Sequence, residues 1–392
     1  MLHVLYFVHD LADPAVRRRV MMLEAGGAAV TLAGFRRTPG IPAELRRLTP
    51  IDLGRTEDGK FAQRLKAVAA AAMTLGPKLG RVGRPDIIVG RNLEMLALAV
   101  RARSLFSAAD IPIVYECLDI HRLLLGGNGV SRAMRRAERA LGRKASLLLT
   151  SSPAFVRDYF RRFEQMDAPV VLLHNKVLEL TGQPSSIDTH PAPPDTGEPW
   201  VIGWFGALRC RKSLELLAEF TRRMQGRFEI VLRGRPAYSE FAGFDGFVTA
   251  EPFMRFEGPY RNPEDLPRIY GAVHFAWAID FFEEGLNSNW LLPNRLFEGC
   301  RHGAVPIAMR RTETGRFLSD RRMGVLLNEA SPRGLAECLG SIDHDAYRRI
   351  QGRVRAEDRS TWVSDLSDCR ALVARLAALG PERTGDAVLQ AA

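Results

Sequence analysis

Residues 200–213 read WVIGWFGALRCRKS, and this stretch decides the fold. Its first part, Trp200–Phe205, is an apolar run of strand length that ends at Gly206, and a helix-period stretch begins at Lys212. A strand that turns into a helix through a glycine is the opening of a βαβ unit, from which parallel sheets are built. The sequence therefore predicts that a Rossmann-like sheet begins at residue 200.

The same alternation runs through the rest of the chain. On the N-terminal side, strands are predicted at 2–8, 29–35, 86–89, 112–115, 146–150 and 170–173, and helices at 15–24, 61–73, 93–105, 131–141 and 153–160. On the C-terminal side, helices are predicted at 212–224, 291–300 and 361–379, and further strands at 229–232, 273–277 and 304–308. Strand and helix in turn predict an α/β protein with two Rossmann-like parallel-sheet domains that face each other across a cleft.

The domain boundaries follow from a break in this pattern. Residues 181–199 (TGQPSSIDTHPAPPDTGEP) lack apolar periodicity and are rich in Pro, Ser, Thr and Gly, which is typical of a linker. We therefore expect an N-terminal domain over 1–180 and a C-terminal domain over 200–358. Residues 359–392 are expected to form a helix that packs back toward the N-terminal domain, followed by a tail.

The composition is that of an ordinary two-domain protein. The chain has 392 residues, of which 46% are hydrophobic and 26% charged. Its longest apolar runs, such as 67–75, are too short for a bilayer span of about 20 residues. The N-terminus reads as a first strand and not as a signal peptide. Five scattered cysteines predict reduced thiols in a cytoplasmic protein.

The charge is unevenly distributed. Residues 1–180 hold 28 Lys and Arg against 17 Asp and Glu, whereas the remainder holds 27 against 28, which together give the net charge of +10. A basic N-terminal half suits an anionic partner such as phospholipid, nucleic acid or a diphosphate-bearing substrate. The alternative is a solvated surface that uses Arg in place of other polar residues.

Two segments of the C-terminal half carry residues suited to a nucleotide. Arg209, Arg211 and Lys212 follow Gly206 at the start of a helix, where backbone N–H groups and cations favour a diphosphate. Glu298 falls in an apolar helical stretch, and its carboxylate could accept both hydroxyls of a ribose. The alternatives are a solvated basic loop and a surface Glu on an amphipathic helix.

Together these segments resemble the GT-B superfamily of glycosyltransferases, notably the family-4-like enzymes of bacterial exopolysaccharide assembly. The resemblance spans nearly the whole chain, although each motif is short. It rests on a diphosphate segment, a later asparagine–lysine–x–x–glutamate segment that is followed by a glycine and a proline, and a base-binding loop. The matching residues are Gly206 and Lys212, then Asn294, Arg295, Glu298, Gly303 and Pro306, then Gly258 and Tyr260.

The resemblance implies a substrate class for each domain. The C-terminal domain would bind a nucleotide sugar, expected to be UDP-linked, and the N-terminal domain would bind the acceptor. The expected reaction is transfer of a hexose to a polyprenyl-diphosphate-linked saccharide in exopolysaccharide synthesis. No DxD-type acidic pair stands out, so we expect no cofactor and no essential metal. The expected place is the cytoplasmic face of the plasma membrane, with peripheral attachment.

The chain departs from the family pattern at two positions. Ala207 stands where many members have Arg, so Arg209 or Arg211 must substitute for it. Trp290 stands where the first Glu of the family's pair would fall, and Glu283 or Glu284 could serve after an insertion. A retaining mechanism is implied by the resemblance, and an inverting one stays open.

Candidate catalytic residues follow the predicted strand at 112–115. An inverting transfer needs a base, which Glu116, Asp119 or His121 could supply, and a retaining one needs groups that steady the developing charge, for which His121 is suited. The alternative is an acid paired with Arg122 and a histidine that caps a helix. The pair His9 and Asp10 is a weaker candidate of the same kind.

Basic residues of the N-terminal half are candidates for the acceptor or for the membrane. Arg135, Arg136 and Arg139 lie on one predicted helix, and Arg17 and Arg18 lie on another. Arginines beside aromatic residues suit an anionic membrane surface. A solvated helix face is the alternative.

Other protein classes fit less well. A dehydrogenase would need G-x-G-x-x-G after the first strand, where the chain reads His9–Asp13, and no Walker loop is present. A basic nucleic-acid-binding protein is supported by charge alone, without a recognisable binding module, so no nucleic acid is expected. A non-catalytic partner subunit that binds a nucleotide sugar stays open, because Ala207 and Trp290 break the family pattern.

Overall fold

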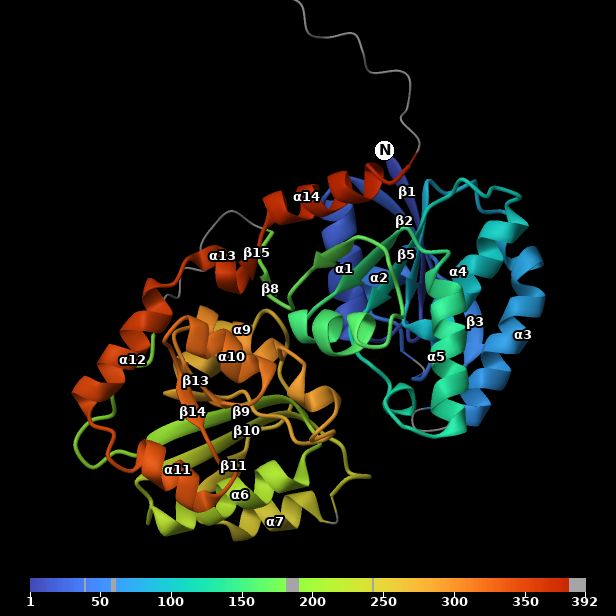
Figure 1. The fold of residues 1–392 in the computed structure, drawn as a ribbon. Helices are drawn as coiled ribbons and strands as arrows, with labels where there is room; N and C mark the ends of the chain where they lie inside the picture. Colours follow the sequence, from blue (N-terminus) through green and yellow to red (C-terminus); the bar gives the residue numbers. More distant parts are fainter. Residues whose placement is uncertain (39, 58–60, 181–189, 242, 381–392) are drawn as a thin grey trace, which may run out of the picture. The chain divides into compact units, whose positions relative to one another are not determined.

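The computed structural model describes residues 1–38, 40–57, 61–180, 190–241 and 243–380, and these form two compact units (Figure 1). The first unit holds Met1–Ser151, Phe155–Leu173 and the described residues from Asp365 onward, and the second holds Ser152–Ala154 and His174–Ser364. The expected linker lies in part outside the described residues, at 181–189, as does the tail at 381–392. Apart from the short stretch Ser152–Ala154, the chain crosses to the second unit at residue 174 and returns at residue 365.

The first unit contains a seven-stranded sheet in which all neighbouring strands are parallel. A parallel sheet is covered on both faces, and the strand sequences IIVGR and LLLT accordingly show buried residues throughout. In spatial order the strands are β3 (Ile51–Arg55), β2 (Ala28–Arg36), β1 (Leu2–Val8), β4 (Ile87–Arg91), β5 (Ile113–Cys117), β6 (Leu147–Thr150) and β7 (Val170–Leu172).

Helices surround this sheet (Figure 1). They are α1 (Pro14–Ala25), α2 (Ala43–Arg46), α3 (Phe61–Leu79), α4 (Leu93–Leu105), the short η1 (Arg122–Leu124), α5 (Gly129–Gly142), the π-helical η2 (Phe155–Arg161) and α14 (Leu366–Ala377). Helix α14 packs against α1 so closely that a Cβ atom at Gly26 would lie 2.3 Å from the carbonyl oxygen of Cys369. The C-terminal helix is thus part of the first unit.

The second unit contains a six-stranded parallel sheet. Its order is β11 (Met254–Phe256), β10 (Phe228–Pro236), β9 (Trp200–Leu208), β12 (Phe275–Trp277), β13 (Val305–Met309) and β14 (Val325–Leu327). The helices are α6 (Arg211–Arg223), α7 (Phe244–Ala250), α8 (Leu266–Gly271), the short η3 (Asn287–Asn289), α9 (Asn294–Arg301), α10 (Glu313–Asp320), α11 (Pro332–Leu339), α12 (His344–Ala356) and α13 (Arg359–Trp362).

The predicted single helix at 361–379 is wrong, because the structure breaks it. Helix α13 ends at Trp362, and β15 (Val363–Ser364) then pairs with β8 (Val177–Leu178). Asp365 starts α14 with a capping box, in which its side chain accepts from the backbone N–H of Asp368 and the Asp368 side chain accepts from that of Asp365. The acidic cap explains the restart, which was not predicted from the sequence.

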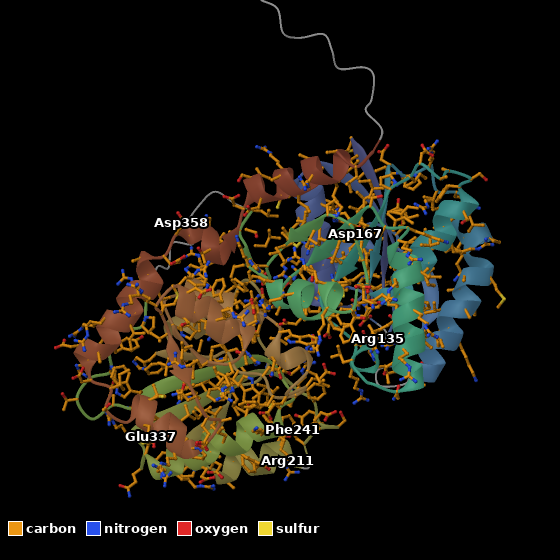
Figure 2. The ribbon with its side chains drawn as sticks, in the orientation of Figure 1. Arg135, Asp167, Arg211, Phe241, Glu337 and Asp358 are labelled. Atoms are coloured by element: carbon orange, nitrogen blue, oxygen red, sulfur yellow. The ribbon has the colours of Figure 1, made fainter. Side chains whose placement is uncertain are left out.

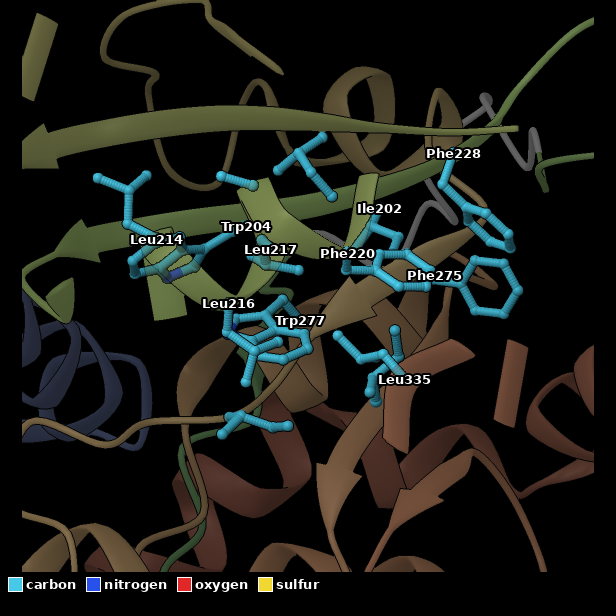
Figure 3. Close-up of a cluster of buried hydrophobic side chains, with 14 of the residues drawn as sticks. Ile202, Trp204, Leu214, Leu216, Leu217, Phe220, Phe228, Phe275, Trp277 and Leu335 are labelled. Carbon is cyan, nitrogen blue, oxygen red and sulfur yellow. The ribbon is translucent and has the colours of Figure 1, made fainter. Parts of the chain in front are cut away.

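The core of the second unit combines aliphatic side chains with large aromatic ones (Figure 3). Trp204 on β9 and Trp277 on β12 are buried beside Phe220 of α6. The indole Nε1 of Trp277 donates to the hydroxyl of Ser213, 3.1 Å away, so the buried polar atom is satisfied. This contact joins the start of α6 to the centre of the sheet and fixes the turn in which the predicted diphosphate residues lie.

Candidate nucleotide site

The centre of the second sheet, between β9 and β12, is where the strand order reverses direction. Open parallel sheets bind ligands beyond the carboxyl ends of the strands at such a point. Strand β9 extends to Leu208, past the predicted end at Gly206, and β12 is followed by the segment Ile279–Glu284. The turn after β9 and this segment therefore lie at the position expected of a ligand site.

Three glycines with positive φ lie at this edge of the sheet. Gly206, Gly234 and Gly258 have φ of 112°, 128° and 73°, which side chains disfavour. Gly206 pairs with Gly234, where a Cβ atom would come 1.9 Å from the Gly206 carbonyl oxygen. Gly258 accepts from the backbone N–H of Gly234 at 2.9 Å. The backbones pack without side chains, which is the kind of surface a nucleotide can approach closely.

Glu298 lies on α9 with 6% of its surface exposed, so the surface-residue alternative is wrong. Its Oε1 accepts from the Asn262 amide at 2.7 Å, and its Oε2 accepts from the Tyr270 hydroxyl at 3.2 Å. Tyr260 is close by: burial, and then the charge of Glu298, raise the pKa of its phenol well above the usual range. From the sequence, Asn262 and Tyr270 were placed in the run that resembles the family's base-binding loop and the helix after it, but neither was given a role at Glu298.

The predicted cations divide into two groups. Arg209 pairs with Asp280 at 3.3 Å, Lys212 pairs with Glu284 at 2.6 Å, and Arg295 donates to the backbone oxygen of Ile279 at 2.9 Å. All three therefore contact the segment 279–284.

Arg211 is held differently. It forms an ion pair at 2.6 Å with Glu215, one turn along α6. Figure 2 shows it near Phe241, with which it lines a small hollow. Asn294, the first residue of α9, is exposed. Arg211 is thus paired along its own helix, whereas Arg209, Lys212 and Arg295 contact the segment 279–284.

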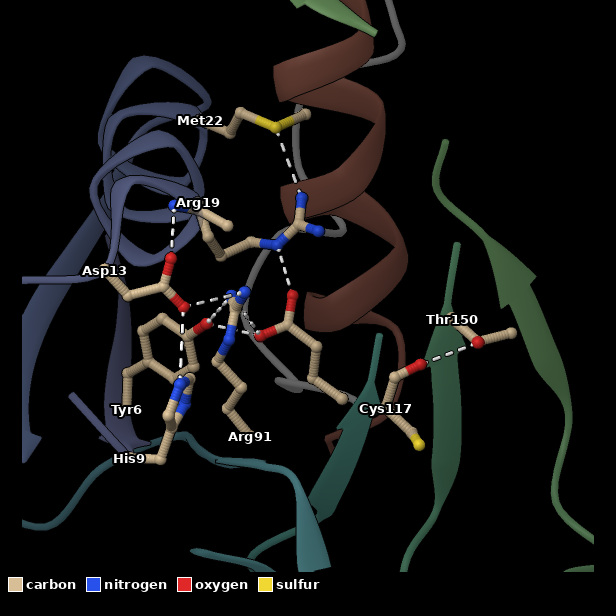
Figure 4. Close-up of polar contacts among 10 residues, drawn as sticks. Tyr6, His9, Asp13, Arg19, Met22, Arg91, Cys117 and Thr150 are labelled. Carbon is tan, nitrogen blue, oxygen red and sulfur yellow. Dashed lines mark hydrogen bonds and ion pairs between the residues drawn. The ribbon is translucent and has the colours of Figure 1, made fainter. Parts of the chain in front are cut away.

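In the first unit, Glu116 is fully buried in a polar network (Figure 4). Its carboxylate accepts from Arg19 at 2.6 Å, from Arg91 at 3.4 Å and from the hydroxyl of Tyr6. Burial alone would raise the pKa of Glu116, but the charges of Arg19 and Arg91 and the hydrogen bonds lower it below the usual 4.5. The expectation that Glu116 faces a substrate as a base is therefore corrected, because both arginines hold it as a buried anion.

His9 joins the same network at the end of β1. Its Nε2 lies 3.5 Å from the carboxylate of Asp13, which also lies 3.5 Å from Arg91 (Figure 4). Burial, then the charge of Arg91, lower the pKa of His9 to about 4, so the imidazole is neutral at pH 7. Asp10, the predicted partner of His9, instead accepts from the backbone N–H of Ala12 at 3.1 Å.

Asp119 and His121 lie on the loop that follows β5. Asp119 is exposed, and His121 is half-buried at the start of η1. The Nδ1 of His121 accepts from the backbone N–H of Leu123 at 3.3 Å, which is the capping role weighed as the alternative. Burial, then the charge of Arg64, lower the pKa of His121, so its imidazole is neutral at pH 7. Of the three catalytic candidates, these two lie outside the buried network.

Comparison with known proteins adds a sequence match over almost the whole length. The family description Glycosyl transferase 4-like domain matches residues 12–176. The succinoglycan biosynthesis protein ExoL of Rhizobium meliloti is 60% identical over 380 residues, which cover 97% of this chain and 94% of that protein. The chain belongs to the glycosyl transferase 4-like family. It is a glycosyltransferase, as the sequence predicted.

Solved structures share the fold of this glycosyltransferase. The sucrose-phosphate synthase of Thermosynechococcus elongatus is 14% identical with a TM-score of 0.72, over 96% of this chain and 98% of that chain. Anabaena Alr3699/HepE in complex with UDP-glucose is 15% identical with a TM-score of 0.65, over 96% of this chain and 100% of that chain. The predicted α/β class and GT-B fold are confirmed.

The arginines assigned to the acceptor or membrane are partly used within the glycosyltransferase itself. Arg135 donates to the carbonyl of Leu124 at 2.6 Å, and Arg139 donates to that of Phe163 at 2.6 Å. Arg17 pairs with Glu44 at 2.7 Å, and Arg18 is half-buried. Arg136 is exposed. The first two tie α5 to neighbouring loops, which reduces their availability to an external anion.

No helix among the described residues is long and apolar enough to cross a membrane. Within the same residues, no group of three or more His, Cys, Asp or Glu side chains is placed to hold a metal ion.

Helix α5 also carries a buried acid that should make stability depend on pH. Glu138 is 1% exposed and accepts from Tyr115 at 2.8 Å and from Tyr159. Burial raises its pKa from 4.5 to about 7. The folded state therefore binds the proton of Glu138 more tightly than the unfolded state does. Protonated Glu138 thus stabilises the fold fully below pH 4.5. As pH rises through 7 this stabilisation is lost, and the free energy of unfolding falls by about 3 kcal/mol.

We expect Glu138→Gln, which stays uncharged, to remove this dependence. Urea unfolding at pH 5.5 and 8 should show a variant that gains stability relative to wild type as pH rises. A difference between the two proteins that does not change with pH would contradict the assignment.

Proposed function

We propose that this glycosyltransferase transfers a hexose from a UDP-sugar to a polyprenyl-diphosphate-linked saccharide during exopolysaccharide synthesis. The single observation that carries the donor side is the buried carboxylate of Glu298, held by Asn262 and Tyr270 beside Tyr260. A carboxylate, which accepts several hydrogen bonds, suits a ribose diol in a parallel-sheet nucleotide site. The solved complexes of Alr3699/HepE with UDP and with UDP-glucose support uracil as the base.

The remaining donor residues would hold the diphosphate. Gly206 and Gly258 leave the backbone open to the ligand, while Arg209, Lys212 and Arg295 supply positive charge at the same edge. Charge that builds on the departing diphosphate would be stabilised by these fixed cations. Arg211 and Asn294, at the starts of α6 and α9, are proposed as further contacts of the donor.

The acceptor is assigned to the first unit. Asp119 and His121, on the loop after β5, are the groups proposed to act on the acceptor hydroxyl and on developing charge. The basic first half of the chain, with 28 Lys and Arg against 17 Asp and Glu, suits a diphosphate-bearing lipid and an anionic membrane face. Exopolysaccharide synthesis is proposed because the 60% identical relative is called a succinoglycan biosynthesis protein.

Calorimetric titration of the full chain with UDP and with GDP tests the donor assignment. We expect UDP to bind and GDP to bind at least about tenfold more weakly, a discrimination of about 1.4 kcal/mol. Absence of binding by both nucleotides would defeat the donor site. Tighter binding of GDP would overturn the assignment of uracil while it retained a nucleotide site.

A further inference from the structure

The segment Ile279–Glu284, with the sequence IDFFEE, contacts all three cations proposed to hold the diphosphate. It follows the carboxyl end of β12, which is a central strand of the second sheet. The carboxylates of Asp280 and Glu284 each form an ion pair with one of these cations. The rings of Phe281 and Phe282 each lie close to one of them. The segment therefore controls where these positive charges are held before a nucleotide arrives.

Asp280 is the fixed part of this segment. Its side chain is 8% exposed, its Oδ1 accepts from the backbone N–H of Phe282 at 2.8 Å, and its Oδ2 faces Arg209 at 3.3 Å. Burial opposes ionisation, but the charges of Arg295 and then Arg209 lower the pKa of Asp280 below its usual value, so it is an anion at pH 7. This buried anion thus contacts Arg209 and orients it, while the backbone oxygen of the neighbouring Ile279 accepts from Arg295.

Aromatic rings complete the support. The guanidinium of Arg209 lies 4.5 Å from the ring centre of Phe282, and the ammonium of Lys212 lies 4.6 Å from that of Phe281. A ring face attracts a cation without neutralising it. Each cation therefore keeps its charge for a further anionic partner.

Glu284 is the exposed part of the segment. Both of its oxygens accept from Lys212, at 2.8 and 2.6 Å, and the two side chains are 50% and 46% exposed. An exposed ion pair of this kind is weak and exchanges readily with another anion. A phosphate oxygen is the same sort of acceptor for a lysine ammonium, so it can replace the carboxylate at Lys212.

We propose that the segment 279–284 sets the affinity for the donor diphosphate through two acids with opposite effects. Asp280 is a positioning residue that holds Arg209 ready for the phosphates. Glu284 occupies Lys212 until a phosphate displaces it, so it lowers affinity. The inference rests on the proposed function, because it takes the nucleoside diphosphate as the ligand of these cations.

The test compares Asp280→Asn and Glu284→Gln, with calorimetric titration of UDP and ligand-observed NMR titration of uridine, which lacks the phosphates. Glu284→Gln should bind UDP about two- to fivefold more tightly, as expected from loss of an exposed competing pair. Asp280→Asn should bind UDP about tenfold more weakly, as expected from loss of a charged hydrogen bond that orients a ligand group. Both variants should bind uridine as wild type does.

Glu337→Gln is the matched control, because Glu337 forms an exposed pair with Arg333 at 2.8 Å on α11; its affinity for UDP should equal that of wild type. Unchanged or weaker UDP binding by Glu284→Gln would overturn the competing role. Unchanged or tighter UDP binding by Asp280→Asn, or an equal loss of uridine binding, would overturn the positioning role. If the wild-type chain binds UDP no more tightly than uridine, the inference is overturned and the ribose site is retained. If the wild-type chain binds neither UDP nor uridine, the proposed function is overturned.

Discussion

Glu298→Ala is expected to weaken UDP binding by about 100-fold or more. Two hydrogen bonds from ribose hydroxyls to a carboxylate would be lost, and bonds to charged groups contribute about 1.5–3 kcal/mol each. The loss of affinity should be large because Glu298 is 6% exposed and its carboxylate is held by Asn262 and Tyr270. Little side-chain entropy of Glu298 is therefore lost when a ribose binds. Calorimetry of UDP and of uridine measures it, and both ligands should be affected alike because both carry the ribose.

Two further variants give this prediction its controls. Glu337→Ala removes an exposed acid on α11 in the same unit and should leave UDP affinity unchanged. Glu298→Gln preserves the shape and one oxygen acceptor, so it should fall between alanine and wild type. Thermal unfolding of each variant separates loss of the site from loss of the fold. UDP affinity within about threefold of wild type in a folded Glu298→Ala protein would remove the ribose assignment.

The fold could be predicted from the sequence because its signals are local. Apolar runs such as Leu2–Val8 and the helical period of Leu93–Leu105 each specify one element, and their alternation specifies parallel sheets. The break at Val363–Ser364 was missed for the opposite reason. The helical pattern continues across it, and only pairing with Val177–Leu178, far away in sequence, favours a strand there.

The donor site was predictable only in part. Glu298 stood out as an acid within an apolar helix, but Asn262 and Tyr270, which hold it, come from 36 and 28 residues away with no shared motif. Gly234 was equally hidden, since its need for a glycine arises from the register that places it opposite Gly206. Sequence pattern indicates which residue carries charge, whereas the partners that fix it depend on the tertiary fold.

Glu116 shows how the same reasoning misassigns an acid. It is the last residue but one of β5, near the carboxyl end of a parallel strand, which is where ligand sites of such sheets lie. The residues that form ion pairs with Glu116 are Arg19 on α1 and Arg91 on β4, which lie 97 and 25 residues away in the sequence. A strand-end acid therefore predicts a polar site but does not distinguish a substrate contact from an internal ion pair.

Glu116→Ala is expected to destabilise the protein by about 3–5 kcal/mol at pH 7, because Arg19 and Arg91 would remain buried without their shared anion. The folded pKa of Glu116 lies below 4.5, so its contribution is full above that pH and is lost as pH falls through the folded value. Urea unfolding should therefore show a gap between variant and wild type that is wide at pH 7 and narrows below pH 4.5.

The matched control is Glu44→Ala, which breaks the more exposed pair with Arg17 and should cost at most about 1 kcal/mol. The isosteric variant Glu116→Gln also distinguishes a structural role of Glu116 from a catalytic one, because the two roles predict different effects on stability and on sugar transfer. If Glu116 were the acceptor base, Glu116→Gln would abolish transfer in a protein as stable as wild type. If Glu116 is instead a buried counter-ion, Glu116→Gln should lower stability, and we expect the molecules that remain folded still to transfer sugar, because Arg19 and Arg91 hold the carboxylate as a buried anion.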